Sequence, residues 1–139
     1  MQQPLPAQHR LSIHLSDRNA TALTDQIALT RHVFAAEMKQ APIRVHAVTV
    51  LPMALYLIAS TYENDDVVER MLRMQRAFKR HAEGDIDWFW PVVGPVPKNG
   101  LTRLVDEFHA MPVTWGLCAT PQDWPFSSIH RVAPQSAVA

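Results

Sequence analysis

Apolar and polar residues follow regular patterns along most of the chain, and these patterns predict its secondary structure. Residues 11–16 (LSIHLS) alternate apolar and polar, which predicts a strand. The apolar residues that follow recur at broadly helical spacing to about residue 40 and predict a helix. Thr21 and Thr24 are the candidate caps at its start, and Pro42 ends it.

Two apolar segments in the middle of the chain predict a pair of strands. Residues 43–51 (IRVHAVTVL) are rich in β-branched residues, and residues 54–61 (ALYLIAST) are more apolar still. Pro52 lies between them in a short bend, so the pair reads as an antiparallel hairpin. We expect this hairpin near the centre of the sheet.

The second half of the chain begins with an amphipathic segment. Residues 67–83 place apolar residues on one side of a predicted helix and a basic flank on the other, and Gly84 is a plausible stop. Residues 85–99 contain three prolines and three large aromatic residues, which exclude a central strand or a helix. We therefore expect an edge segment or a packed loop there.

The last predicted element is a short helix from Leu101 to about Ala110, ended by Pro112. Beyond it we expect an irregular tail whose Trp115, Trp124 and Phe126 pack on the body of the protein.

The resulting order is strand, helix, strand, strand, helix, irregular or strand, helix, which is an α+β pattern. Helices packed on one face of an antiparallel sheet would be its natural arrangement. We expect a flexible leader over residues 1–10, a single domain over residues 11–130 and a loose tail over residues 131–139.

Size and composition agree with one globular domain. At 139 residues a second domain would leave neither with a proper core. No apolar run approaches the roughly 18 residues of a membrane span, and the amino terminus does not resemble a signal peptide. Cys118 is the single cysteine, so no internal disulfide can form, which fits a reducing cytoplasm.

The formal net charge is zero, with 13 Lys and Arg against 13 Asp and Glu. Nucleic-acid-binding proteins generally carry a basic surface, because neutralising phosphates drives the salt-dependent part of binding. A local basic patch is compatible with zero net charge, but net charge gives no argument for DNA binding.

Several motifs, in their order and spacing, resemble the REP-associated tyrosine transposases, which are bacterial enzymes acting on single-stranded DNA. They are the Val50-Leu51-Pro52 strand end, the basic spacing of residues 73–80, the aromatic Trp88-Phe89-Trp90 and the closing run over residues 123–128. The resemblance covers about residues 11–130. It implies an IS200-like, single-tyrosine HUH transposase fold, a ferredoxin-like antiparallel sheet with helices packed mainly on one face.

The resemblance also shows which chemistry this chain lacks. The family carries two histidines one residue apart just after the Leu-Pro, and a tyrosine in the later helix. The histidines hold Mg²⁺ or Mn²⁺, and the tyrosine forms a phosphotyrosine link to DNA. Here these positions are Ala54, Tyr56 and Glu107. Alanine offers no ligand, a phenol is a poor one, and glutamate cannot form the phosphotyrosine. We therefore expect no catalytic residues, no metal and no cofactor.

Relocated catalytic residues are a further alternative. Tyr56 as a displaced nucleophile is less plausible than Tyr56 as a packing residue. His14 and His46, on neighbouring predicted strands, could share a face, but two histidines without a third ligand make a weak metal site.

Three functions remain open. The first is a domesticated DNA-binding protein that recognises hairpin or single-stranded DNA. Its candidate contacts are Arg70, Arg73, Arg76, Lys79, Arg80, Trp88 and Trp90. The structural alternative is that the basic residues form a solvent-exposed helix face and that the two tryptophans pack in the core or in a loop. The second is a protein-interaction module, such as a homodimer, with apolar contacts from residues 88–97, Met71 and Met74. The third is an active DNA transposase with relocated residues. In each case we expect a cytoplasmic protein, nucleoid-associated if it binds DNA.

Overall fold

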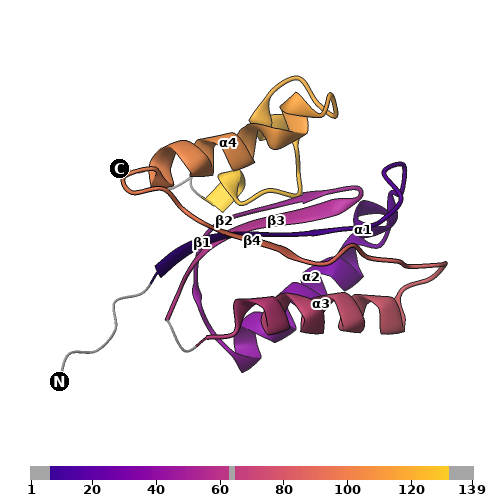
Figure 1. Cartoon of the computed structure of the whole chain (residues 1–139). Helices are drawn as coiled ribbons and strands as arrows, with labels where there is room; N and C mark the ends of the chain where they lie inside the picture. The colour runs from indigo at the N-terminus through magenta and orange to yellow at the C-terminus, as the bar shows by residue number, and fades with distance from the viewer. Residues whose placement is uncertain (1–6, 63–64, 132–139) are drawn as a thin grey trace.

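The computed structural model describes residues 7–62 and 65–131, which fold into a four-stranded antiparallel sheet with packed helices (Figure 1). The strands are β1 (Ala7–His14), β2 (Arg44–Leu51), β3 (Ala54–Thr61) and β4 (Val92–Pro95), in the spatial order β2-β3-β1-β4. The helices are α1 (Ala22–Asp25), α2 (Ile27–Gln40), α3 (Val67–His81) and α4 (Leu101–Thr114), followed by the 3-10 turn η1 (Pro121–Asp123). None of these helices is long and apolar enough to cross a membrane.

Figure 1 shows α2 and α3 below the sheet and α4 above it. The larger core lies under the sheet, where Leu11, Leu55 and Leu57 meet Met74 and Phe78 of α3. A smaller core lies above it, where Ala47 and Ile58 pack against Leu104 and Phe108 of α4. The expected α+β fold, with its helices mainly on one face, is confirmed.

The predicted hairpin forms, but only one of its strands is central. β2 and β3 pair antiparallel, and β3 pairs on its other side with β1. β2 is an outer strand, contrary to our expectation. Its apolar character is explained by the segment Phe126–Ser128, which covers its free edge. The Val50 N–H donates to the Phe126 carbonyl (2.9 Å), and the Ser128 N–H donates to the Val48 carbonyl (2.9 Å).

β1 begins at Ala7, so the predicted leader of residues 1–10 is too long by four residues. β3 is eight residues long and offers a ladder partner to every residue from Ala7, opposite Thr61, to His14, opposite Ala54. Pairing along a central strand therefore extends β1 beyond its own apolar pattern. Residues 1–6 and 132–139 of the predicted leader and tail lie outside the described residues.

The helix predicted from about residue 23 to residue 40 is divided at Gln26 into α1 and α2. The Gln26 side chain makes two hydrogen bonds with the backbone of Glu83, in the loop after α3. Its amide nitrogen donates to the Glu83 carbonyl (3.1 Å), and its Oε1 accepts from the Glu83 N–H (2.8 Å). This long-range contact fixes the corner between the two helices, and no local pattern announces it.

Pro112 does not end the last helix, contrary to the sequence prediction, because α4 continues through it to Thr114. A proline inside a helix leaves the carbonyl four residues earlier without its N–H partner. Here that carbonyl belongs to Phe108, and the Thr49 hydroxyl of β2 donates to it (3.0 Å). The sheet thus supplies the hydrogen bond that the proline removes.

The proline-rich segment over residues 85–99 was expected to be an edge segment or a packed loop. It contains the short edge strand β4. In the tail, Trp124 donates its Nε1–H to the Val50 carbonyl (2.8 Å) and stacks edge-on with Phe126. Trp115 is half exposed, so the expectation that it packs on the body is wrong.

Candidate functional site

Alternate residues of β1 and β3 point to the face of the sheet that α4 covers. Tyr56 of β3 lies directly opposite Ser12 of β1, and Ala54 lies opposite His14. Because side chains two residues apart on a strand share a face, Ala54 and Tyr56 point to the same side. The two strand positions where the resemblance calls for metal ligands therefore face α4 together.

Tyr56 is held between two other rings. It meets His14 at 5.2 Å and Phe108 of α4 at 5.7 Å between ring centroids, both edge-on. Burial raises the pKa of Tyr56 and lowers the pKa of His14. Both side chains are therefore neutral near pH 7, and the Tyr56 hydroxyl is a phenol rather than a nucleophilic phenolate. His14 Nε2 shares a hydrogen bond of 2.9 Å with the Ser12 hydroxyl.

Glu107 of α4 and Tyr56 line the same hollow, which has a volume of about 430 Å³. The Glu107 carboxylate lies 3.4 Å from Nε of Arg103, one turn earlier on the exposed side of α4. The resemblance therefore aligns Tyr56 and Glu107 with positions that the fold brings to one site. Ala54, two residues before Tyr56 on the same face of β3, is fully buried.

The residues at these positions do not fit a divalent metal. Ala54 has no donor atom, and Tyr56 offers a phenol whose pKa burial has raised. Over residues 7–62 and 65–131, no three His, Cys, Asp or Glu side chains cluster closely enough to hold a metal ion.

A second hollow of about 390 Å³ adjoins the first and shares Arg10, Leu104 and Glu107 with it. It adds five residues around the start of α4, among them the two cations Lys98 and Arg103; the others are Pro97, Asn99 and Gly100. We refer to the two hollows together as the α4 groove, characterised by Arg10, Ser12, Tyr56, Lys98, Arg103 and Glu107. Three cations face one carboxylate in it, so the groove favours an anionic ligand.

The start of α4 strengthens this preference. Gly100 is the N-cap residue and supplies no side-chain cap, so amides of the first turn keep their hydrogen-bonding capacity. The helix dipole adds partial positive charge at the same end.

The Arg10 side chain lies against Gly94, its partner residue on the neighbouring strand β4. A methyl group at Gly94 of β4 would lie 3.1 Å from Nε of Arg10, so the bare backbone makes room for that side chain. Sequence reasoning missed Arg10, Gly94, Lys98 and Arg103. The run Lys98-Asn99-Gly100 before a predicted helix was a signal that could have been used, because it places a cation where a helix begins.

The basic flank predicted on α3 is not one surface, because Arg70 is buried. Its side chain is 3% exposed and bonds to Glu37 of α2 (3.0 Å), Asp65 (2.6 Å) and the Ala41 carbonyl. The prediction that Arg70 is available to a phosphate is therefore wrong. Arg70 lies on the basic side of α3, but that side faces α2 at this position, so the residue is buried between the two helices.

The other basic residues of α3 lie further out. Arg73 donates to Glu37 (2.8 Å), and Arg76 pairs with Glu69 at 2.6 Å. Lys79 and Arg80 are exposed. Acidic residues thus balance the first half of the flank, as in the solvated-face alternative, and the cationic character is concentrated near the end of α3.

The two tryptophan candidates differ in exposure. Trp88 packs edge-on against Phe78 at 5.8 Å and donates its Nε1–H to the Gln75 carbonyl (3.1 Å). Trp88 therefore belongs to the core, as in the packing alternative. Trp90 is 69% exposed, and its role as a stacking residue stays a prediction.

His14 and His46 do not form a shared site. β3 separates their strands, and His46 bonds instead to the Ser60 hydroxyl (2.6 Å) near the opposite end of β3 from His14. The expectation that they lie on neighbouring strands is wrong.

Comparisons with known proteins agree with this geometry. No family model matches the chain. It is 29% identical over 124 residues to a REP-associated tyrosine transposase of Escherichia coli (strain K12), a match covering 86% of this chain and 74% of that protein. It is 28% identical over 139 residues to a Haemophilus influenzae protein assigned to the same class, covering 86% and 78%.

The fold matches a solved structure of a REP-associated tyrosine transposase bound to a REP hairpin, with a TM-score of 0.84 and 23% identity. That match covers 98% of this chain and 84% of the solved chain. The chain therefore has the fold of that REP-associated tyrosine transposase. The chain is a relative of the REP-associated tyrosine transposases, as its motifs predicted.

Proposed function

We propose that this chain is a DNA-binding protein that recognises hairpin DNA and its single-stranded flank without cleaving the strand. The single observation that carries the proposal is the α4 groove, where a hollow lined by Arg10, Lys98 and Arg103 adjoins a hollow lined by Arg10 and Tyr56. Cations that contact phosphates beside a ring that can stack on a base suit a single strand. A relative in a solved structure is bound to a REP hairpin, which gives the ligand class.

The absence of cleavage in this proposal follows from three side chains that fail for independent reasons. Ala54 cannot hold a metal, Tyr56 is a neutral phenol whose pKa is raised, and Glu107 cannot form a phosphotyrosine. Each failure alone stops the family's reaction. The groove around them keeps its cations, so binding does not depend on the lost chemistry.

Fluorescence anisotropy with a labelled hairpin carrying a single-stranded flank tests the binding. We expect affinity to fall as salt rises, and the double variant R10Q/R103Q to bind roughly tenfold more weakly. Lys39→Gln is the matched control, because Lys39 is an exposed cation of α2 outside the groove. No binding at low salt, or equal losses in the control and the groove variant, would contradict the proposal.

Incubation with Mn²⁺ and single-stranded DNA, followed by a denaturing gel, tests the lack of cleavage. We expect no covalent protein–DNA band from the natural chain. We expect the triple variant A54H/Y56H/E107Y to form one if the frame and the groove persist. A band from the natural chain would instead support the alternative of an active transposase with relocated residues.

A protein-interaction module, with a homodimer as its simplest form, is the second candidate function. It is favoured by β4, an outer strand of the sheet, whose neighbourhood exposes Phe89, Trp90 and Val92. An exposed apolar edge strand can pair with another chain. Sedimentation at high concentration tests it: a dimer that Val92→Lys dissociates supports this function, and a monomer at all concentrations contradicts it.

A further inference from the structure

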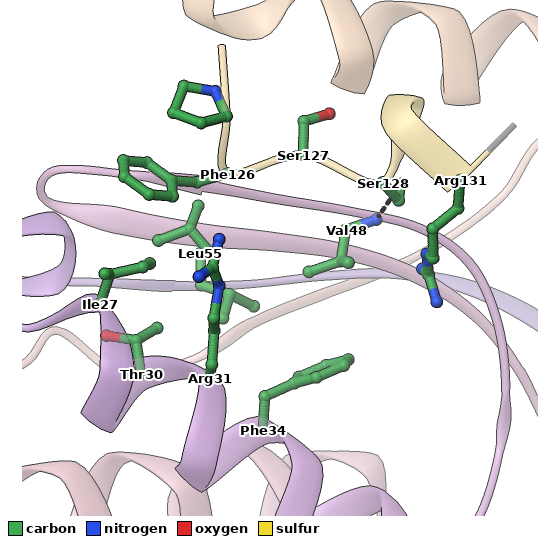
Figure 2. A pocket seen from close by; sticks show the side chains of 12 residues that line it. Ile27, Thr30, Arg31, Phe34, Val48, Leu55, Phe126, Ser127, Ser128 and Arg131 are labelled. Atoms are coloured by element: carbon green, nitrogen blue, oxygen red, sulfur yellow. Dashed lines mark hydrogen bonds between the residues drawn. The ribbon is translucent and has the colours of Figure 1, made fainter. Parts of the chain in front are cut away.

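A separate pocket, distinct from both hollows of the α4 groove, lies on the other side of the sheet. It has a volume of about 190 Å³ and lies between α2, the outer strand β2 and the segment Phe126–Ser128 (Figure 2). Its floor and walls come from Phe34, Val48, Leu55 and Phe126. We refer to it as the α2–β2 pocket.

Two arginines reach this pocket from different elements. In Figure 2, Arg31 rises from α2 and Arg131 descends from the end of the described chain. No Asp or Glu is among the lining residues, and neither arginine forms an ion pair within residues 7–62 and 65–131. Two cations over an apolar floor favour a ligand with an anionic group and an apolar body.

The aromatic side chains that line the pocket favour a ligand whose apolar part is a planar ring. The Arg31 guanidinium lies 5.5 Å from the centre of the Phe126 ring, which holds a planar cation over a planar ring. Phe34 of α2 lines the same hollow from below. Such surfaces stack on nucleobases with little dependence on sequence. The volume is below the range of about 300–1,000 Å³ usual for drug-sized ligands, and the pocket is open on one side. It therefore suits one base ring, with a sugar and a phosphate at its mouth.

Hydrogen bonds within the protein hold the walls of the pocket in place. The segment Phe126–Ser128 is tied to β2 by a backbone ladder, and the Ser128 hydroxyl accepts from the Val48 N–H (2.9 Å; Figure 2). The Thr30 hydroxyl donates to the Leu23 carbonyl (2.8 Å), so it is already used within the protein. A preformed wall lowers the ordering cost of binding.

We propose that the α2–β2 pocket binds one nucleotide, with the base against Phe34 and Phe126 and the phosphate between Arg31 and Arg131. The nucleotide has two possible sources, an extrahelical nucleotide of a bound DNA strand or a free mononucleotide. Only the first source rests on the proposed function. The pocket and the α4 groove use no residue in common, so each can fail without the other.

Amide NMR spectra of the full chain, titrated with each deoxynucleoside monophosphate to millimolar concentration, test the pocket. We expect saturable shifts at Arg31 and Phe126–Ser128, with inorganic phosphate or a deoxynucleoside alone binding at least about tenfold more weakly. R31Q and R131Q should each weaken nucleotide binding about tenfold. Lys39→Gln and the groove variant R10Q/R103Q should leave it unchanged. Melting curves of each variant establish that it is folded.

The two sources are separated by a hairpin with a single-stranded flank. If the hairpin shifts the same amides and displaces the mononucleotide, the source is a DNA strand; if only mononucleotides act, it is a free nucleotide. Both results support the pocket. It is overturned if no nucleotide produces saturable shifts there, or if phosphate alone reproduces them with equal affinity. Loss of hairpin binding in R10Q/R103Q with intact mononucleotide binding would separate the groove from the pocket.

Discussion

At the residue scale, the basic side chains of α3 have different surroundings although Arg70, Arg73, Arg76 and Lys79 recur every third residue along the helix. Arg70 lies inside the protein between Glu37 and Asp65, whereas Arg76 pairs with Glu69 at the surface. A sequence pattern shows only that both are basic residues on one helical side. Burial depends on what packs against the helix, here α2, and that contact is long-range.

The difference between these arginines predicts a difference in stability. Arg70→Met should lower the free energy of unfolding by about 3–5 kcal/mol, because it leaves Glu37 buried with one fewer cation. Arg76→Met, the matched control on the same helix, should cost less than about 1 kcal/mol since its ion pair is exposed. Urea denaturation measures both. Equal small losses would mean that the Arg70 network is not a structural unit.

His109 gives a pH dependence at the same scale. It is buried on α4 and shares a hydrogen bond of 2.9 Å with the Ser128 hydroxyl. Burial lowers its pKa, with nearby Arg131 acting in the same direction and Asp106 opposing it. A histidine whose folded pKa lies below its unfolded value near 6.5 binds fewer protons in the folded state. Its contribution is therefore fully present above that unfolded value and is lost as pH falls below it.

Melting curves between neutral and mildly acidic pH check this dependence. The natural chain should lose stability as pH falls, with His14 and His46 contributing in the same direction because burial lowers their pKa values too. His109→Gln should reduce the loss while keeping a hydrogen bond to Ser128. An unchanged pH profile in that variant would show that His109 does not contribute.

At the scale of elements, α4 and β2 depend on each other through one hydroxyl. Pro112 removes the N–H that would bond to the Phe108 carbonyl, and Thr49 replaces it from the sheet. The bond also fixes where α4 lies above the sheet, and therefore helps to position the α4 groove. A proline inside a helix is tolerated here because a neighbouring strand supplies the donor.

A double-mutant cycle tests this exchange. Thr49→Val should lower the free energy of unfolding by about 1–3 kcal/mol, because it leaves the Phe108 carbonyl buried without its partner. In a Pro112→Ala background, the backbone N–H that the substitution restores can bond to that carbonyl, so Thr49→Val should cost clearly less. Equal costs in both backgrounds would show that the hydroxyl does not replace the missing N–H.

Element order was largely predictable from the sequence, and element placement was not. The helix α3 could be predicted from the helical spacing of its apolar residues. The hairpin of β2 and β3 could be predicted from two apolar segments separated by a short turn. The outer position of β2 depends on the pairing of Ser12 with Tyr56 and on the cover from Phe126–Ser128. Both contacts join distant segments, so no local pattern could reveal them.

At the scale of the whole molecule, a net charge of zero conceals an uneven distribution. Acidic residues at positions 37, 65 and 69 pair with the first arginines of α3. The α4 groove instead has Arg10, Lys98 and Arg103 against Glu107. Composition alone could not locate this groove, because its cations come from two segments, β1 and residues 98–103, that only the fold brings together. The lost family positions, by contrast, were visible from the sequence because the resemblance supplied their spacing.

Mapping the bound DNA tests the central claim most directly. Amide NMR spectra of the full chain, titrated with a hairpin that carries a single-stranded flank, would locate the contact surface. We expect salt-sensitive, saturable shifts at Arg10, Gly94 and residues 98–103 around the α4 groove, with the amide of Lys39 unchanged. Shifts confined to the end of α3 around Lys79 and Arg80, or no saturable shift at low salt, would contradict it.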